Sequence, residues 1–140
     1  MARATGVDFP GAWYQVLDRG IERRTIFPTR RCNERFIELL SSLPERFGVQ
    51  LHAYALMGNH YHLQLESREA NLSQTMHWLN VGYSVWFNRK YTRVGALFQG
   101  RFEAIPHENC ASFCRGDRDQ QKGSDGEQLI GWLGLKLSKQ

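Results

Sequence analysis

With 140 residues, 41% hydrophobic and 23% charged, the chain can bury one core, and no apolar run reaches the roughly 18 residues of a membrane span. It opens with no secretory signal, and three cysteines give no paired framework, which predicts reduced thiols and a soluble cytoplasmic protein without membrane contact. Residues 1–107 hold 13 basic and 9 acidic side chains, against 5 and 5 in residues 108–140, so the net charge of +4 belongs to the first part.

Arginine dominates this basic part, since 12 of its 13 basic residues are arginines. The planar guanidinium suits bidentate contact with phosphate, which makes nucleic acid a better candidate partner than a membrane surface. Composition alone leaves the alternative of an ordinary solvated surface open.

The chain begins with a strand and an arginine-rich turn. Residues 13–19 are rich in aromatic and branched side chains and stop at Gly20, which predicts a strand followed by a turn. Arg19, Arg23 and Arg24 flank that turn. They form either a solvated loop or a grip on a phosphate backbone.

A helix is predicted next, from about residue 29 to residue 47. Thr29 follows a proline and offers its hydroxyl as an N-cap, and an apolar stripe with helical spacing runs as far as Gly48. Pro44 conflicts with this pattern because it lacks a backbone N–H, so a kink or an earlier end is expected there.

Residues 49–57 and 60–66 predict a hairpin joined at Gly58 and Asn59. Strict alternation places His60 and His62 on one face, roughly 6 to 7 Å apart, where two imidazoles can converge on one divalent cation. The alternative is a polar sheet face that contacts only water. Two ligands would leave coordination positions open for substrate, which indicates a Lewis-acid role toward phosphate.

The next segment predicts a long helix from Asn71, with a stripe that includes Tyr83 and Trp86. Arg89, Lys90 and Arg93 follow, and this basic cluster is either plain surface or a site for phosphate contact and base stacking. Residues 96–107 predict the last strand. The order strand, helix, strand, strand, helix, strand describes a ferredoxin-like α+β fold over residues 12–107.

Residues 108–140 differ in character. They are mostly polar and glycine-containing, which predicts a poorly structured tail. The apolar residues 129–137 are interrupted by two glycines, so we expect a poor helix with no sheet to join.

The segment 57–63, Met-Gly-Asn-His-Tyr-His-Leu, resembles the HUH motif of single-tyrosine transposases of bacterial insertion sequences and of REP-associated tyrosine transposases. Three further blocks agree in order: Arg-Gly at 19–20, Phe-Asn-Arg-Lys-Tyr at 87–91 and Phe-Gln-Gly-Arg-Phe at 98–102. The resemblance covers residues 12–107.

The resemblance implies a DNA transposase with an HUH-type ferredoxin-like fold that cuts and joins single-stranded or hairpin DNA and forms a homodimer. It implies that His60 and His62 hold Mg²⁺ or Mn²⁺ while a tyrosine hydroxyl attacks phosphorus to form a 5′-phosphotyrosine. The implied contacts to the DNA backbone are Arg19, Arg23, Arg24, Arg89, Lys90, Arg93 and Arg101.

The chain departs from the family at the nucleophile. The family's tyrosine lies on a helix after the last strand, and that helix also supplies a third metal ligand, but no such segment follows Glu108. None of the five tyrosines, which are Tyr14, Tyr54, Tyr61, Tyr83 and Tyr91, matches its position.

We therefore expect a truncated or frame-shifted member that binds single-stranded DNA with little or no cleavage. Two alternatives stay open. One is a non-catalytic, regulatory nucleic-acid-binding module that needs the basic loops and no metal, and the other is an inert remnant with an incomplete core.

Overall fold

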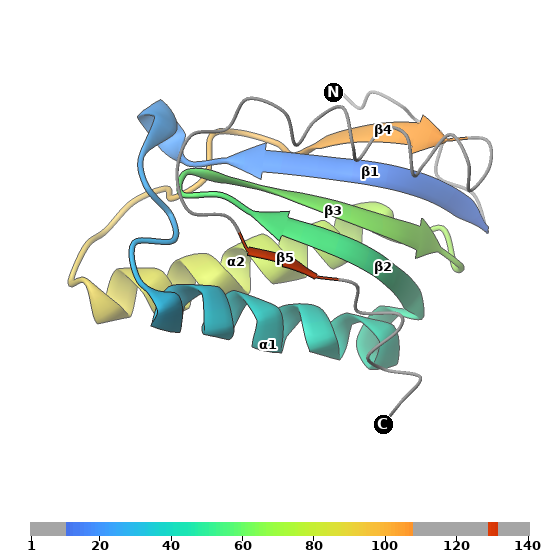
Figure 1. Cartoon of the computed structure of the whole chain (residues 1–140), viewed down its shortest axis with the longest axis horizontal. Coiled ribbons are helices and arrows are strands. Elements are labelled where there is room, and N and C mark those ends of the chain that lie inside the picture. The colour runs from blue at the N-terminus through green and yellow to red at the C-terminus, as the bar shows by residue number, and fades with distance from the viewer. Residues whose placement is uncertain (1–10, 108–128, 132–140) are drawn as a thin grey trace.

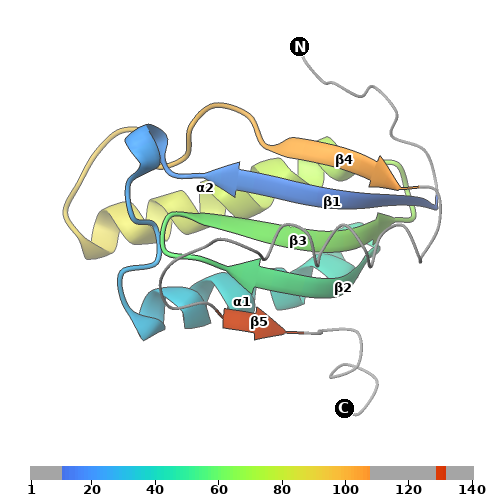
Figure 2. The same cartoon turned by 45° about the horizontal axis from the view of Figure 1, so that its top comes forward.

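Two helices cover one face of an antiparallel sheet in the computed structural model, which describes residues 11–107 and 129–131 (Figure 1). The sheet has the strand order β4-β1-β3-β2-β5. Figure 2 shows the same sheet with both helices behind it. None of the helices in the described part combines the length and apolar composition that a membrane span needs.

The central strands confirm the ferredoxin-like prediction. All their pairings are antiparallel: β3 lies between β1 and β2, and β4 lies on the other side of β1. Their bounds are Ala12–Arg19 for β1, Val49–Leu56 for β2, His60–Ser67 for β3 and Glu103–His107 for β4.

A fifth strand, β5 (Leu129–Gly131), pairs with the edge of β2. The expectation that the closing apolar segment has no sheet to join is therefore wrong. An edge strand presents unpaired N–H and C=O groups, and a β-compatible segment can satisfy them regardless of its distance along the chain. The rest of the predicted poorly structured tail, residues 108–128 and 132–140, lies outside the described residues. So do residues 1–10, and the segment 108–128 includes two of the three cysteines, Cys110 and Cys114.

Helix α1 spans Arg30–Phe47 and continues through Pro44, so the expected early end is wrong. Only three helical residues follow Pro44. The hydrogen bond that proline cannot donate is therefore lost in the last turns of the helix, close to the end where backbone carbonyls lack helical partners anyway. Gly48 ends the helix in the left-handed region, as predicted. The Thr29 hydroxyl caps no backbone N–H and lies 3.3 Å from the Cys32 sulfur instead.

Helix α2 spans Leu72–Lys90 and buries the predicted stripe against the sheet. An aromatic cluster joins the helices to the sheet. The ring centroid of Phe36 in α1 lies 4.8 Å from that of Tyr61 and 5.2 Å from that of Tyr83. Trp86 is only half-buried, whereas Phe87 is 6% exposed, so Phe87 completes the stripe.

The last predicted strand is shorter than expected, since only Glu103–His107 forms β4. Gly95 and Gly100 have φ values of 95° and 60° and turn the chain before and after Leu97 and Phe98. Those two side chains are buried in the core, and Phe98 forms one isolated bridge with Gly20. Core packing and two left-handed glycines interrupt the extended run.

A short 3₁₀ turn, η1 (Ile21–Arg23), links β1 to the segment that leads into α1. It lies at the end of the sheet where β3 begins (Figure 1). The candidate site is built at this end.

Candidate metal centre and nucleic-acid interface

His60 and His62 lie on the sheet face opposite the helices. Tyr61, between them, points into the helix layer, where its hydroxyl donates to Asn80 Oδ1 of α2 at 2.7 Å. Because side chains alternate along a strand, the two histidines share the other face, as predicted. Their ring centroids are 5.0 Å apart, less than the roughly 6.6 Å of two residue rises, so the rings lean together.

His60 is set up as a neutral nitrogen donor. Burial lowers the pKa of His60, and the positive charge of Arg19 lowers it further. Arg19 is the cross-strand partner of His60 in the β1–β3 ladder. A neutral imidazole keeps a lone pair on one ring nitrogen, which is the form that binds metal ions.

Two imidazoles supply part of a coordination sphere. Within residues 11–107 and 129–131, no group of three or more His, Cys, Asp or Glu side chains is arranged to hold a metal ion. The donors therefore fit an open site, in which water and phosphate oxygens complete the coordination, rather than a closed structural zinc site.

The arginine turn sits directly beside His60. Its backbone is left-handed at two successive non-glycine residues, Glu22 (φ 55°) and Arg23 (φ 58°). Such backbone costs of order 1 kcal/mol per residue and persists only where surrounding contacts hold it. Arg24 forms an exposed ion pair with Glu22 at 3.4 Å.

Two segments that are distant in sequence hold this turn in place, the hairpin turn at Asn59 and the segment that contains Leu97 and Gln99. Ile21 N–H donates to the Leu97 carbonyl at 2.8 Å, and Gly20 N–H donates to the Asn59 carbonyl at 2.9 Å. Gln99 N–H donates to the Arg19 carbonyl at 2.9 Å. These bonds gather Arg19, Arg23 and Arg24 at one end of the sheet, and Arg101 follows two residues after Gln99 with an exposed side chain.

The second predicted basic cluster lies at the end of α2, in the helix layer. Arg89 and Lys90 are exposed, and the Lys90 ammonium lies 5.8 Å from the centroid of Trp86. Arg93 is tied down locally, because its guanidinium donates to Asn88 Oδ1 at 2.9 Å. This cluster and the arginine turn belong to different layers of the molecule.

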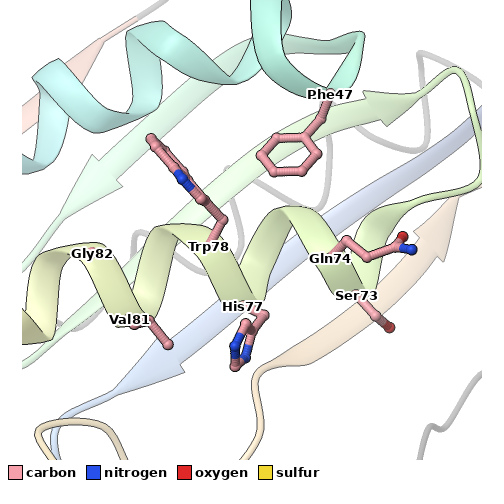
Figure 3. A pocket seen from close by; sticks show the side chains of 7 residues that line it. All are labelled: Phe47, Ser73, Gln74, His77, Trp78, Val81 and Gly82. Atoms are coloured by element: carbon pink, nitrogen blue, oxygen red, sulfur yellow. The ribbon is translucent and has the colours of Figure 1, made fainter.

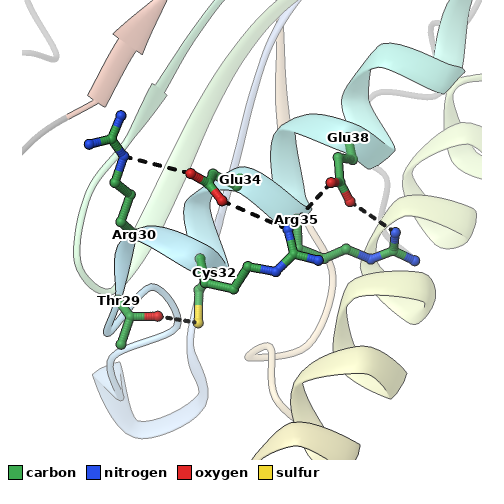
Figure 4. A network of polar contacts seen from close by, with 7 residues as sticks. Thr29, Arg30, Cys32, Glu34, Arg35 and Glu38 are labelled. Atoms are coloured by element: carbon green, nitrogen blue, oxygen red, sulfur yellow. Dashed lines mark hydrogen bonds and ion pairs between the residues drawn. The ribbon is translucent and has the colours of Figure 1, made fainter.

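Other arginines are engaged in ion pairs along α1. Arg30 and Arg31 contact Glu34, and Arg31 and Arg35 contact Glu38 at 3.3 and 3.2 Å (Figure 4). Their charges are largely compensated within the helix. The uncompensated positive charge therefore lies more at the ends of the sheet and of α2 than along α1.

A hollow on the helix layer lies between the end of α1 and the first half of α2. Figure 3 shows Phe47 and Trp78 facing it, with His77 and Val81 along its α2 side. It is mainly apolar, and the guanidinium of Arg46 lies 4.6 Å from the Trp78 ring centroid. It belongs to the layer opposite the histidine pair.

All five tyrosines lie within the described residues, and none is on the histidine face. Tyr14, Tyr54 and Tyr61 are strand residues buried in the core toward the helices. Tyr83 is fully buried, and its hydroxyl donates to the Ile26 carbonyl. Tyr91 ends α2, with its hydroxyl 3.5 Å from the sulfur of Cys32 at the start of α1. The sheet separates Tyr14, Tyr54, Tyr61 and Tyr83 from His60 and His62, whereas Tyr91 lies at the end of α2 beside the start of α1.

Sequence reasoning missed Asn59 as a site residue. Its Oδ1 lies 2.7 Å from His60 Nδ1. An asparagine in a Gly-Asn pair between two strands is adequately explained as a turn former, so the turn signal concealed the contact.

Comparison with known proteins gives this site a context. The profile of the family described as "Transposase IS200 like" matches residues 9–111. The chain belongs to the IS200-like transposase family. This membership confirms the resemblance, and it gives the chain a DNA transposase-type function in a family whose chemistry depends on a metal ion.

Solved structures share the fold of this IS200-like transposase chain. A REP-associated tyrosine transposase bound to a REP hairpin superposes with a TM-score of 0.65 at 12% identity, covering 83% of this chain and 68% of that one. A candidate transposase from Deinococcus radiodurans R1 superposes with a TM-score of 0.59 at 13% identity, covering 86% and 95%. Among curated proteins no significant sequence match is found.

Proposed function

We propose that residues 12–107 form a transposase domain that binds single-stranded or hairpin DNA across the sheet end carrying His60 and His62, and that none of its own tyrosines becomes linked to DNA. The solved relative bound to a REP hairpin supports hairpin DNA as the ligand class. The observation that carries the second half is the position of the tyrosines: four are buried on the far side of the sheet, and the hydroxyl of the fifth, Tyr91, lies beside Cys32 at the start of α1.

The arginine turn is the proposed phosphate grip. Arg19, Arg23 and Arg24 lie at the end of the sheet that carries His60, and Arg101 follows the segment bonded to Arg19. Arginine makes bidentate contacts with phosphate that fix register without reading sequence. Arg89, Lys90 and Arg93 are proposed as a second contact region for a strand that passes around this end of the molecule.

The histidine pair is the proposed site for Mg²⁺ or Mn²⁺. When bound, such an ion supplies Lewis-acid polarisation of a phosphate oxygen. His60 and His62 contribute two nitrogen donors from one face, and Arg19 adds positive charge beside them that favours a phosphate there. Cleavage additionally needs a nucleophile on this face, which the five tyrosines do not provide.

The test uses a hairpin oligonucleotide with a single-stranded flank, labelled at its 3′ end so that a 5′-phosphotyrosine adduct would keep the label. With Mn²⁺ present, we expect a shifted complex on a native gel and no labelled protein on a denaturing gel. A covalent band would overturn the claim about the tyrosines, and its loss in Tyr91→Phe would identify the nucleophile. Absence of the native complex would overturn DNA binding.

A regulatory nucleic-acid-binding module remains the second candidate, because it explains the basic turn without any cleavage. The double variant His60→Ala, His62→Ala distinguishes the transposase domain with a metal site from the metal-independent binding module. Weakened, metal-independent binding by the variant supports the metal site, whereas unchanged binding favours the module. Sedimentation of the free protein and of its DNA complex tests the proposed homodimer.

A further inference from the structure

Asn59 connects the strained arginine turn to the first histidine. Its side-chain Nδ2 donates a long hydrogen bond of 3.5 Å to the Arg23 carbonyl, and its Oδ1 lies 2.7 Å from His60 Nδ1. Its own carbonyl accepts the Gly20 N–H at 2.9 Å. One residue thus contacts both ends of the turn and the imidazole.

The chemistry of these groups determines which atom carries each hydrogen. A backbone carbonyl can only accept, so the Asn59 NH₂ group must face Arg23. The opposite orientation of the amide would place two oxygens against each other. Asn59 Oδ1 therefore faces His60, and because an amide oxygen also only accepts, His60 Nδ1 must carry the hydrogen. In the neutral ring, the lone pair is then on Nε2.

The unusual backbone of the turn explains how the acceptor is held there. Glu22 and Arg23 have left-handed φ values in the turn whose last carbonyl accepts from Asn59, and the Arg23 N–H donates to the Gly20 carbonyl at 2.9 Å. Ile26 N–H donates to the Gly58 carbonyl at 2.8 Å, which ties the segment after the turn to the hairpin that carries Asn59. Hydrogen bonds therefore connect the turn, through the hairpin and Asn59, to the histidine.

We propose that Asn59 is a positioning residue that holds His60 in the tautomer with a bare Nε2, the nitrogen available to a metal ion. This inference rests on the metal site proposed above. Ligating histidines are commonly fixed through the ring nitrogen that does not bind the metal, and loss of such a partner typically weakens metal affinity about 10- to 100-fold.

The first test needs neither metal nor mutation. Long-range ¹H–¹⁵N spectra of the metal-free wild-type protein at pH 8 report which imidazole nitrogen is protonated. We expect His60 to show a protonated Nδ1 and a bare Nε2. The reverse pattern would overturn the proposal, even if Mn²⁺ binds. Conversely, the expected tautomer without Mn²⁺ binding would leave this proposal standing while the metal site fails.

Two substitutions of Asn59 then distinguish its role as a hydrogen-bond acceptor from its role in forming the turn. Asn59→Leu removes the acceptor, whereas Asn59→Asp keeps an oxygen against Nδ1. We expect Asn59→Leu to lose the fixed tautomer and to bind Mn²⁺ about 10- to 100-fold more weakly, measured from the free Mn²⁺ signal in electron paramagnetic resonance. Asn59→Asp should keep the tautomer.

The neighbouring Gly58→Ala is the matched control, because an added Cβ meets no atom within 4 Å there. It should leave both the spectrum and Mn²⁺ affinity unchanged. If Asn59→Leu behaves like the wild type, or if Asn59→Asp loses the tautomer as Asn59→Leu does, the acceptor role is wrong.

Discussion

Asp18 of β1 and Tyr61 of β3 stand opposite each other in the ladder, and both hydrogen-bond to the side chain of Asn80. Asn80 Nδ2 donates to Asp18 Oδ2 at 2.8 Å, and the Tyr61 hydroxyl donates to Asn80 Oδ1 at 2.7 Å. This buried chain joins helix α2 to the strand residue that separates the two histidines. The HUH segment is thereby fixed to the helix layer by directed bonds as well as by apolar packing.

Replacing Asp18 should change how stability depends on pH. Burial raises the pKa of Asp18 to about 7, against the lowering effect of its hydrogen bonds. When the pKa of a carboxyl is higher in the folded state than in the unfolded state, the protein loses stability as pH rises from the unfolded-state pKa toward the folded-state pKa, which is about 7 here. We therefore expect the free energy of unfolding of Asp18→Asn, measured in urea, to rise by about 2 to 3 kcal/mol relative to that of the wild type between pH 5 and pH 8.

Glu38→Gln is the control for that experiment. Glu38 is exposed, and hydrogen bonds from Arg35 and Arg31 lower its pKa, so it is ionised in both states across this range. Its difference from the wild type should stay constant between pH 5 and pH 8. A constant difference for Asp18→Asn as well would show that Asp18 titrates normally.

Tyr61→Phe should lower the free energy of unfolding by about 1 to 3 kcal/mol, because it leaves the half-buried Asn80 side chain without the donor to its Oδ1. A double-mutant cycle with Asn80→Ala isolates the hydrogen bond from the loss of packing. The expected coupling energy is about 1 kcal/mol. Additive effects of the two substitutions would mean that the bond contributes nothing in solution.

Gly20→Ala should disturb the arginine turn. A Cβ at this position would collide with the Arg24 carbonyl oxygen and lie 2.9 Å from Ile26 Cγ2. We expect a loss of about 1 to 3 kcal/mol in unfolding free energy together with weaker hairpin binding. Gly58→Ala, in the adjacent turn, meets open space and should affect neither quantity. Equal behaviour of the two variants would contradict the close packing at Gly20.

Arg23→Gln and Arg24→Gln should each weaken hairpin DNA binding and make its salt dependence shallower. Each phosphate contact contributes about 0.7 to 0.9 to the slope of log affinity against log salt, so each variant should reduce the slope by about that amount. Arg46→Gln is the control, because that guanidinium packs on Trp78 in the helix layer. A slope that changes equally for all three variants would indicate a general charge effect.

Local periodicity was sufficient for the elements and for the histidine pair. Alternation in residues 60–66 put His60 and His62 on one face because a strand repeats every two residues, and the structure agrees. Where local rules conflicted with packing, prediction was less accurate. Burial of Leu97 and Phe98 and the turns at Gly95 and Gly100 replaced the first half of the last strand.

The sequence by itself therefore determined the fold class, the family and the two candidate metal ligands, because each depends on local periodicity or on short motifs and their order along the chain. Only the tertiary structure decided that four of the five tyrosines lie across the sheet from the histidines, since this depends on which face the helices cover. It also decided that Asn59 meets Arg23, and that Leu129–Gly131 joins β2. Such contacts join segments far apart in sequence, and no local pattern encodes them.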